Sequence, residues 1–143
     1  MPVILAALLV GTGAWQEQAP AQEAAAGEFS EAAVRKAAAG WLELVDAGRS
    51  AASWKRASSA FRTGMSREAW TKRVRSIRSQ LGELQERNLV SARFARQLPG
   101  SPEGEYVVLL YASRFVGYPV ATERVIMRRG SDGSWGVAGY FVH

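Results

Sequence analysis

Few side chains in this sequence could carry out covalent or metal chemistry. The 143 residues include no cysteine and a single histidine, His143, which is the last residue. Without cysteine the chain forms no disulfide, thiolate nucleophile or zinc-thiolate site, and one histidine does not provide a multi-histidine metal site. Phosphate-binding glycine loops, HExxH and GxSxG motifs do not occur either. The sequence therefore predicts no metal, no cofactor and no motif-defined catalytic residue.

Glu123 is the acidic residue whose setting could support proton transfer. It interrupts an apolar run, Ala121, Val125 and Met127, on one face of an expected strand, since alternate strand residues point the same way. If this face is inward, burial would raise the pKa of the carboxyl group, and Glu123 could act as a general base with a tyrosine as the acid. The alternative that we favour is an ion pair with a neighbour such as Arg114 or with a helix arginine.

Aromatic residues are the main candidates for a ligand pocket. The tryptophans of the expected helices lie on apolar stripes, where packing in the core is their ordinary role. A hollow between helices and sheet would instead let aromatic walls and a few polar groups bind a small ligand. The candidate pocket residues are Trp54, Trp70, Tyr111, Glu123 and Trp135.

Basic residues are concentrated in the middle of the chain. Between Arg49 and Arg96 there are twelve Arg or Lys residues and only three acids. Such an excess could bind phosphates of an anionic envelope lipid or polymer. On the third expected helix, however, the cations fan around the whole polar side, which favours a solvated face over a focused anion site. No nucleic-acid motif accompanies the charge, so nucleic-acid binding is not expected.

Three helices are expected to precede the sheet, from apolar residues that recur at a period of 3.6. Each begins at a serine that can cap it and ends at a glycine that can terminate it. The segments are 30–48, 50–64 and 66–82. Asp46 is expected to form hydrogen bonds in the turn at Gly48.

Beyond residue 82 the period changes to two, which predicts strands. The expected strands are 84–98, 106–115, 120–129 and 135–142. Segment 106–115 is apolar on both faces and is therefore expected to be central. Short connections favour an antiparallel meander, and helices on one side of such a sheet define an α+β fold.

The N-terminal segment has the order of a signal peptide. An apolar run, residues 3–10, precedes small residues and a stretch rich in Gln, Ala and Pro, although no Lys or Arg comes before the run. We expect a signal peptide over 1–21, a flexible linker over 22–29 and a single α+β domain over 30–143. Cleavage before Trp15 and a disordered or anchoring tail are the alternatives. Export to the periplasm or beyond follows from the first interpretation.

The sequence resembles the bacterial domain-of-unknown-function 4019 family at many positions that follow one another in the same order as in that family. They are the segments 41–48, 98–106 and 132–141 with Ser53, Trp54, Phe61, Trp70, Arg78, Leu81, Gly82, Arg87, Phe115 and Glu123. The resemblance implies a small exported protein with an NTF2-like, cystatin-like cone: three helices on a curved four-stranded sheet. Two departures are Gly136, where the family usually has a basic residue, and 117–119, where it usually has a polar turn with a lysine. The family brings no established reaction.

These observations leave three functional hypotheses. The leading one is an exported, non-enzymatic domain that uses its cone pocket or its sheet face to bind a small molecule, peptide or protein. The second is an acid-base enzyme that uses Glu123. The third is an envelope protein whose Arg-rich helices dock on anionic lipid or polymer. A homodimer that pairs through its sheets is also compatible with the resemblance.

Overall fold

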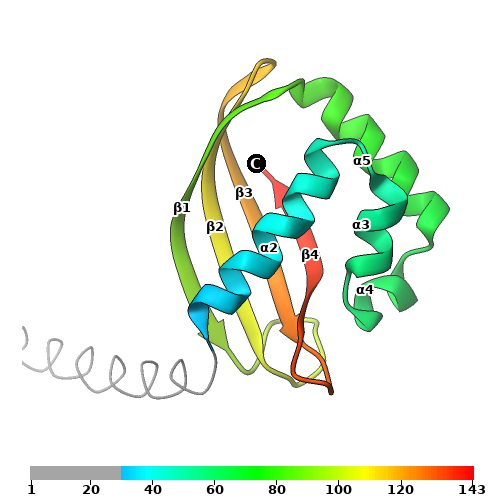
Figure 1. Cartoon of the computed structure of the whole chain (residues 1–143), viewed down its shortest axis with the longest axis vertical. Helices are drawn as coiled ribbons and strands as arrows, with labels where there is room; N and C mark the ends of the chain where they lie inside the picture. The colour runs from blue at the N-terminus through cyan, green and yellow to red at the C-terminus, as the bar shows by residue number, and fades with distance from the viewer. Residues whose placement is uncertain (1–29) are drawn as a thin grey trace, which may run out of the picture. The chain divides into compact units, whose positions relative to one another are not determined.

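The described part of the chain begins with helices and ends with a sheet (Figure 1). The computed structural model describes residues 30–143, so the expected signal peptide 1–21 and linker 22–29 lie outside the described residues. The helices are α2 (Glu31–Asp46), α3 (Ser50–Arg56), α4 (Ser59–Gly64) and α5 (Arg67–Leu81). The strands are β1 (Leu84–Ala95), β2 (Tyr106–Phe115), β3 (Tyr118–Arg129) and β4 (Trp135–Val142). The predicted α+β order is confirmed, and residues Ala32–His143 form one compact unit.

Helices α2 and α5 bury the apolar stripes that the sequence predicts. The buried residues of α2 are Val34, Ala38, Trp41, Leu42 and Val45. Those of α5 are Trp70, Val74 and Leu81. The Oγ atom of Ser66 accepts a hydrogen bond from the Ala69 amide at 3.1 Å and caps α5. Gly82 ends this helix with a φ of 75°, a left-handed conformation that favours glycine.

The prediction of a single second helix is wrong, because segment 50–64 forms two short helices, α3 and α4. The chain is extended at Ala57 and Ser58, with ψ angles of 166° and 157°. There the Ser58 amide donates a hydrogen bond to the Val137 carbonyl of β4 at 2.9 Å. The Ser58 hydroxyl also accepts from the Phe61 amide at 3.2 Å and starts α4. Docking on the sheet therefore competes with helix continuation at this point.

The four strands form an antiparallel sheet in the order β1-β2-β3-β4. Strand β2 lies inside the sheet, as its two apolar faces predict. Helix α2 crosses one face of the sheet, and α3, α4 and α5 lie together beyond β4 in the same view (Figure 1). The Trp41 ring of α2 packs 5.4 Å from the Tyr140 ring of β4 and 5.7 Å from the Trp70 ring of α5. These aromatic contacts join both helices to the sheet.

Two glycines at the sheet margin, Gly136 and Gly117, permit close backbone approaches. A Cβ atom on Gly136 would lie 2.9 Å from the Ser58 amide nitrogen. A Cβ atom on Gly117, in the β2–β3 hairpin, would lie 2.6 Å from the Gln80 carbonyl oxygen at the end of α5. Any side chain larger than hydrogen would therefore push a helix end away from the sheet.

Candidate functional site

Glu123 lies on the inner face of β3 with a fully buried side chain. Arg87 of β1 donates from Nε to Oε1 at 2.7 Å and from Nη2 to Oε2 at 3.0 Å. The Ser113 hydroxyl donates to Oε1 at 2.5 Å, and the Tyr140 hydroxyl donates to Oε2. Each carboxylate oxygen thus accepts two hydrogen bonds from protein groups, one of them from a cation. The ion pair that we favoured from the sequence exists, but its cation is Arg87, and Arg114 instead pairs with Glu86 on the exposed side at 2.5 Å.

Arg87 also binds Asp46, at the C-terminal end of α2. Its Nη1 donates to Oδ2 at 2.7 Å and its Nη2 donates to Oδ1 at 3.0 Å. Arg78 of α5 completes the chain by donating to Oδ1 of the same carboxylate. The prediction that Asp46 serves the turn at Gly48 is therefore wrong, because the Gly48 amide donates to the Val45 carbonyl.

These four charged residues form a chain, Arg78–Asp46–Arg87–Glu123, that runs from the partly exposed Asp46 end to the fully buried Glu123, and its two positive and two negative charges balance. Burial disfavours the ionised form of Asp46, but hydrogen bonds and charges of Arg87 and Arg78 outweigh it and lower the pKa of Asp46. The pKa of Arg87 is raised despite its burial, because two carboxylates bind it. The chain connects α2 and α5 to β1 and β3.

Two tyrosines near this chain lose their hydroxyl protons less readily than an ordinary tyrosine does. Burial and the negative charge of Glu123 raise the pKa of Tyr140 above its usual range. Burial also raises the pKa of Tyr111, which lies opposite Glu123 in the register of β2 and β3. An arginine and two hydroxyls hold both oxygens of the Glu123 carboxylate, and removal of the arginine would leave a buried charge without its partner.

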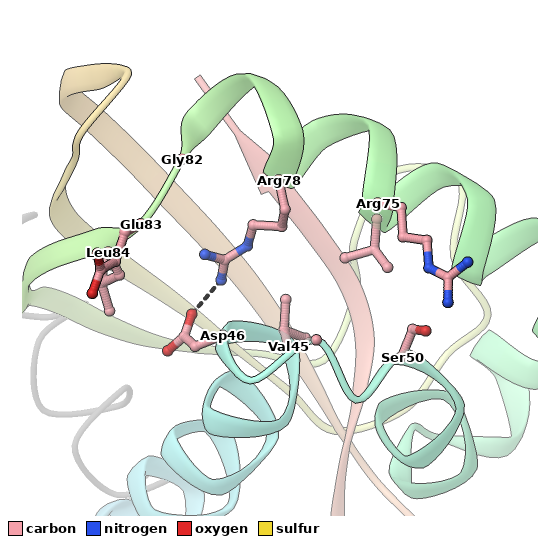
Figure 2. A pocket seen from close by; sticks show the side chains of 10 residues that line it. Val45, Asp46, Ser50, Arg75, Arg78, Gly82, Glu83 and Leu84 are labelled. Carbon is pink, nitrogen blue, oxygen red and sulfur yellow. Dashed lines mark hydrogen bonds and ion pairs between the residues drawn. The ribbon is translucent and has the colours of Figure 1, made fainter.

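A pocket opens at the Asp46 end of the charged chain, between the end of α2, helix α5 and the start of β1. We call it the α2–α5 pocket. Its volume is about 350 Å³. Its lining residues include apolar Val45, Val74 and Leu84, charged Asp46, Arg75, Arg78 and Glu83, and Ser50. Figure 2 shows Arg78 reaching across the pocket to Asp46, Arg75 one turn earlier on α5, and Glu83 and Leu84 at the opposite end.

Two arginines and two acids give the α2–α5 pocket its polar character, and the two arginines differ in their partners. The buried Nε atom of Arg78 has no hydrogen-bond partner within residues 30–143, while the same side chain binds Asp46 and its Cζ atom lies 5.0 Å from the centre of the Phe115 ring. Arg75 is exposed and makes no ion pair with the residues that the structure describes. Arg75 is therefore the cation here that is available to a ligand.

The predicted pocket residues are not brought together in one pocket. Trp70 is buried, and its Nε1 atom donates to the Ser53 hydroxyl at 2.9 Å. Trp54 is half-buried and donates to the Met65 carbonyl at 2.7 Å. Tyr111 and Glu123 lie on the inner face of the sheet, and Trp135 lines a different pocket beside the β3–β4 turn. Their role in ligand binding stays a prediction.

Sequence reasoning did not identify Arg87, Arg78 and Asp46 as partners. Asp46, Arg78, Arg87 and Glu123 all occur among the residues that carry the family resemblance, which is the signal that separates them from other charges. Their pairing depends on how β1, β3 and two helices are placed, which the sequence does not give.

Two further findings apply to residues 30–143. No group of three or more His, Cys, Asp or Glu side chains in this range is arranged to hold a metal ion. No helix within the same range is both long and apolar enough to cross a membrane.

Comparison with known proteins gives the class and then the family. A solved structure from Catenulispora acidiphila, described only as a 2.5 Å structure from that organism, has a TM-score of 0.50 and 17% sequence identity. The match covers 78% of this chain and 88% of that chain, and it supports the α+β fold alone. The pattern of the family described as "Protein of unknown function (DUF4019)" matches residues 37–140, so the chain belongs to this family. No curated protein matches the chain.

Proposed function

We propose that the chain is an exported, non-enzymatic binding domain with an NTF2-like cone, and that the α2–α5 pocket takes a small organic anion. The observation that carries this proposal is one pocket of about 350 Å³ that combines apolar walls with an arginine, Arg75, that has no ion-pair partner among the described residues. Ligand sites are commonly concave, mostly apolar and equipped with a few polar groups that orient the ligand.

The chemistry of the lining favours an amphipathic carboxylate. Val45, Val74 and Leu84 can pack against a short apolar body. The planar guanidinium of Arg75 matches a carboxylate with two parallel hydrogen bonds. Arg78 is already held by Asp46, so Arg75 supplies the positive charge for the ligand, while Glu83, the other acid of the lining, lies at the opposite end of the pocket (Figure 2).

The enzymatic hypothesis gains no support from Glu123. A general base must be within hydrogen-bond reach of the proton that it removes, and it needs a free lone pair. The Glu123 side chain is fully buried, and Arg87, Ser113 and Tyr140 already bind its two oxygens. We therefore propose binding without catalysis.

Export and the cone belong to the same proposal. The apolar run at residues 3–10, followed by small residues, supports a signal peptide. The order of helices before a four-stranded antiparallel meander supports the cone. Homodimer formation and the absence of nucleic-acid binding stay predictions of the sequence.

The test is calorimetric titration with a panel of short fatty acids and aromatic carboxylates. We expect saturable binding to the wild type and at least about tenfold weaker binding to Arg75→Gln, because one charge-assisted bidentate contact is lost. Lys72→Gln is the matched control, since Lys72 is exposed on the same helix and does not line the pocket. Equal weakening in both variants, or no binding to the wild type, would reject the proposal.

A second candidate function is docking on an anionic envelope surface. Between Arg49 and Arg75 the chain has eight basic residues, all exposed, and a single acid, Glu68. Arg67 and Glu68 form the ion pair found within this segment, at 3.4 Å between exposed side chains. Sedimentation with anionic vesicles should show binding that decreases as salt rises, because salt screens exposed charges. Salt-independent sedimentation, or none, would exclude this candidate.

A further inference from the structure

A second, more polar pocket lies between the α3–α4 junction and the β3–β4 turn. Its volume is about 610 Å³. One wall is the α3–α4 junction, which is fixed to the sheet by the hydrogen bond from the Ser58 amide to the Val137 carbonyl. The other wall is the end of β3 with the turn that follows it and Trp135 at the start of β4. We call this the four-arginine pocket.

The four-arginine pocket takes its cations from three elements. They are Arg56 at the end of α3, Arg62 on α4, and Arg128 and Arg129 at the end of β3. Arg56, Arg62 and Arg128 form no ion pair with residues of the described part of the chain, and Arg129 pairs with Glu105 at 3.0 Å. A site with several unpaired guanidinium groups is strongly attractive to anions.

Two of these arginines are held in place by uncharged groups. Nη1 of Arg62 donates to the Lys55 carbonyl at 2.6 Å and to the Ala57 carbonyl at 3.1 Å. The Cζ atom of Arg128 lies 5.6 Å from the centre of the Tyr106 ring. These contacts orient the guanidinium groups without neutralising them, so less conformational entropy is lost when a ligand binds.

Asp132, the acid in the lining of this pocket, already accepts hydrogen bonds within the β3–β4 turn. Oδ1 of Asp132 accepts hydrogen bonds from the Ser134 amide at 3.0 Å and from the Ser134 hydroxyl at 2.7 Å. These bonds lower the pKa of Asp132, so it stays ionised but is directed at the turn. Four positive charges and one negative charge leave a net charge of +3 in the lining.

We infer that the four-arginine pocket binds a phosphate group carried by a small molecule or a lipid headgroup. Arginine forks donate paired hydrogen bonds to phosphate oxygens, and a dianionic phosphomonoester can use several forks at once. Serine hydroxyls from α4 and the turn provide further donors around the same volume. This site is separate from the α2–α5 pocket and does not depend on the carboxylate proposal.

The test uses the full chain and two sources of phosphate. Inorganic pyrophosphate and glycerol 3-phosphate are titrated by calorimetry, and phosphatidylcholine vesicles with and without phosphatidic acid are used in sedimentation. The double variant Arg56→Gln/Arg128→Gln is compared with Arg67→Gln/Lys72→Gln, which removes the same charge from exposed sites outside the pocket. Circular dichroism establishes that both variants are folded.

We expect saturable binding of at least one phosphate source, weakened by about tenfold or more in the pocket variant and by less than about twofold in the control. Binding to soluble phosphates identifies a free ligand, and binding only to phosphatidic acid identifies a headgroup. Equal weakening in both variants would show non-specific attraction and overturn the inference. Failure of the wild type to bind either source would overturn it as well.

Discussion

The arginines of this domain fall into two groups that differ in their surroundings. Arg78 and Arg87 lie mostly buried between helices and sheet, and carboxylates of Asp46 and Glu123 bind them. Arg56 and Arg62 line the four-arginine pocket, where they are exposed and have no carboxylate partner within residues 30–143. The same side chain therefore serves the fold in one region and is free for a ligand in the other.

The difference teaches that burial decides what an arginine does here. Moving a guanidinium out of water costs several kcal/mol, and the cost is offset only if carboxylates and further hydrogen bonds surround it. Removal of one partner of such a pair lowers the free energy of unfolding by ~3–5 kcal/mol. An exposed guanidinium keeps its hydration and needs no partner. Substitutions in the first group should therefore change stability, and those in the second should change binding.

The largest expected effect is that of Arg87→Leu. It leaves Glu123 buried without its cation, and we expect the free energy of unfolding to fall by about 3–5 kcal/mol. Urea unfolding followed by circular dichroism measures this change. The double variant Arg87→Leu/Glu123→Leu should lose less than the sum of the two single variants, because no unpaired charge stays at Glu123. Strict additivity would contradict the buried ion pair.

A smaller effect is expected from Gly136→Ala, which tests the junction that forms one wall of the four-arginine pocket. The new Cβ atom would lie 2.9 Å from the Ser58 amide nitrogen, so the α3–α4 junction must move. We expect a loss of about 1–3 kcal/mol in thermal or urea unfolding. Gly64→Ala is the control, because a Cβ atom there meets nothing within 4 Å. A neutral Gly136→Ala would show that the junction is not held against β4.

The acid side of the stability profile should depend on Asp46. Its pKa is lower in the folded protein than the ordinary value of 3.8, so its contribution is present above that value and is lost as the pH falls through the folded pKa. Wild type should therefore lose more stability than Asp46→Asn between neutral and strongly acidic pH. Parallel pH profiles from urea unfolding would contradict this role of Asp46.

The smallest expected effect on stability is that of Arg56→Gln. The side chain is exposed and makes no ion pair with the described residues, so the free energy of unfolding should change by no more than about 0.5 kcal/mol. Thermal unfolding with and without pyrophosphate separates the two roles. We expect the variant to lose only the stabilisation that pyrophosphate gives to the wild type. A large loss of stability in the absence of pyrophosphate would contradict the distinction between carboxylate-bound arginines and pocket arginines.

Much of the fold could be predicted because its signals are local. Apolar spacing and terminal serines or glycines located α2 and α5, and period-two patterns located β2 and β4 at their observed bounds. The break at Ser58 could not be predicted, since it depends on a hydrogen bond to Val137 far along the chain. Local propensity does not decide a helix boundary when tertiary contacts compete.

The candidate sites could be predicted only in part. The alternation around Glu123 placed it on one face with Ala121 and Val125 and left open whether that face is the inward one, which the structure shows it to be, and the apolar stripes placed Trp70 in the core. The partner of Glu123 is on β1, two strands away, and the α2–α5 pocket depends on how α2, α5 and β1 meet. Distances between elements follow from packing and register, so residue types alone do not reveal Arg75 or Arg87 as members of a site.

The binding claim is tested most directly by a crystal structure of the protein soaked with the carboxylate that binds most tightly in solution. We predict electron density for the ligand in the α2–α5 pocket, with its carboxylate against Arg75 and its apolar body against Val45, Val74 and Leu84. Density for the bound carboxylate elsewhere, with the α2–α5 pocket empty, would contradict the proposed function.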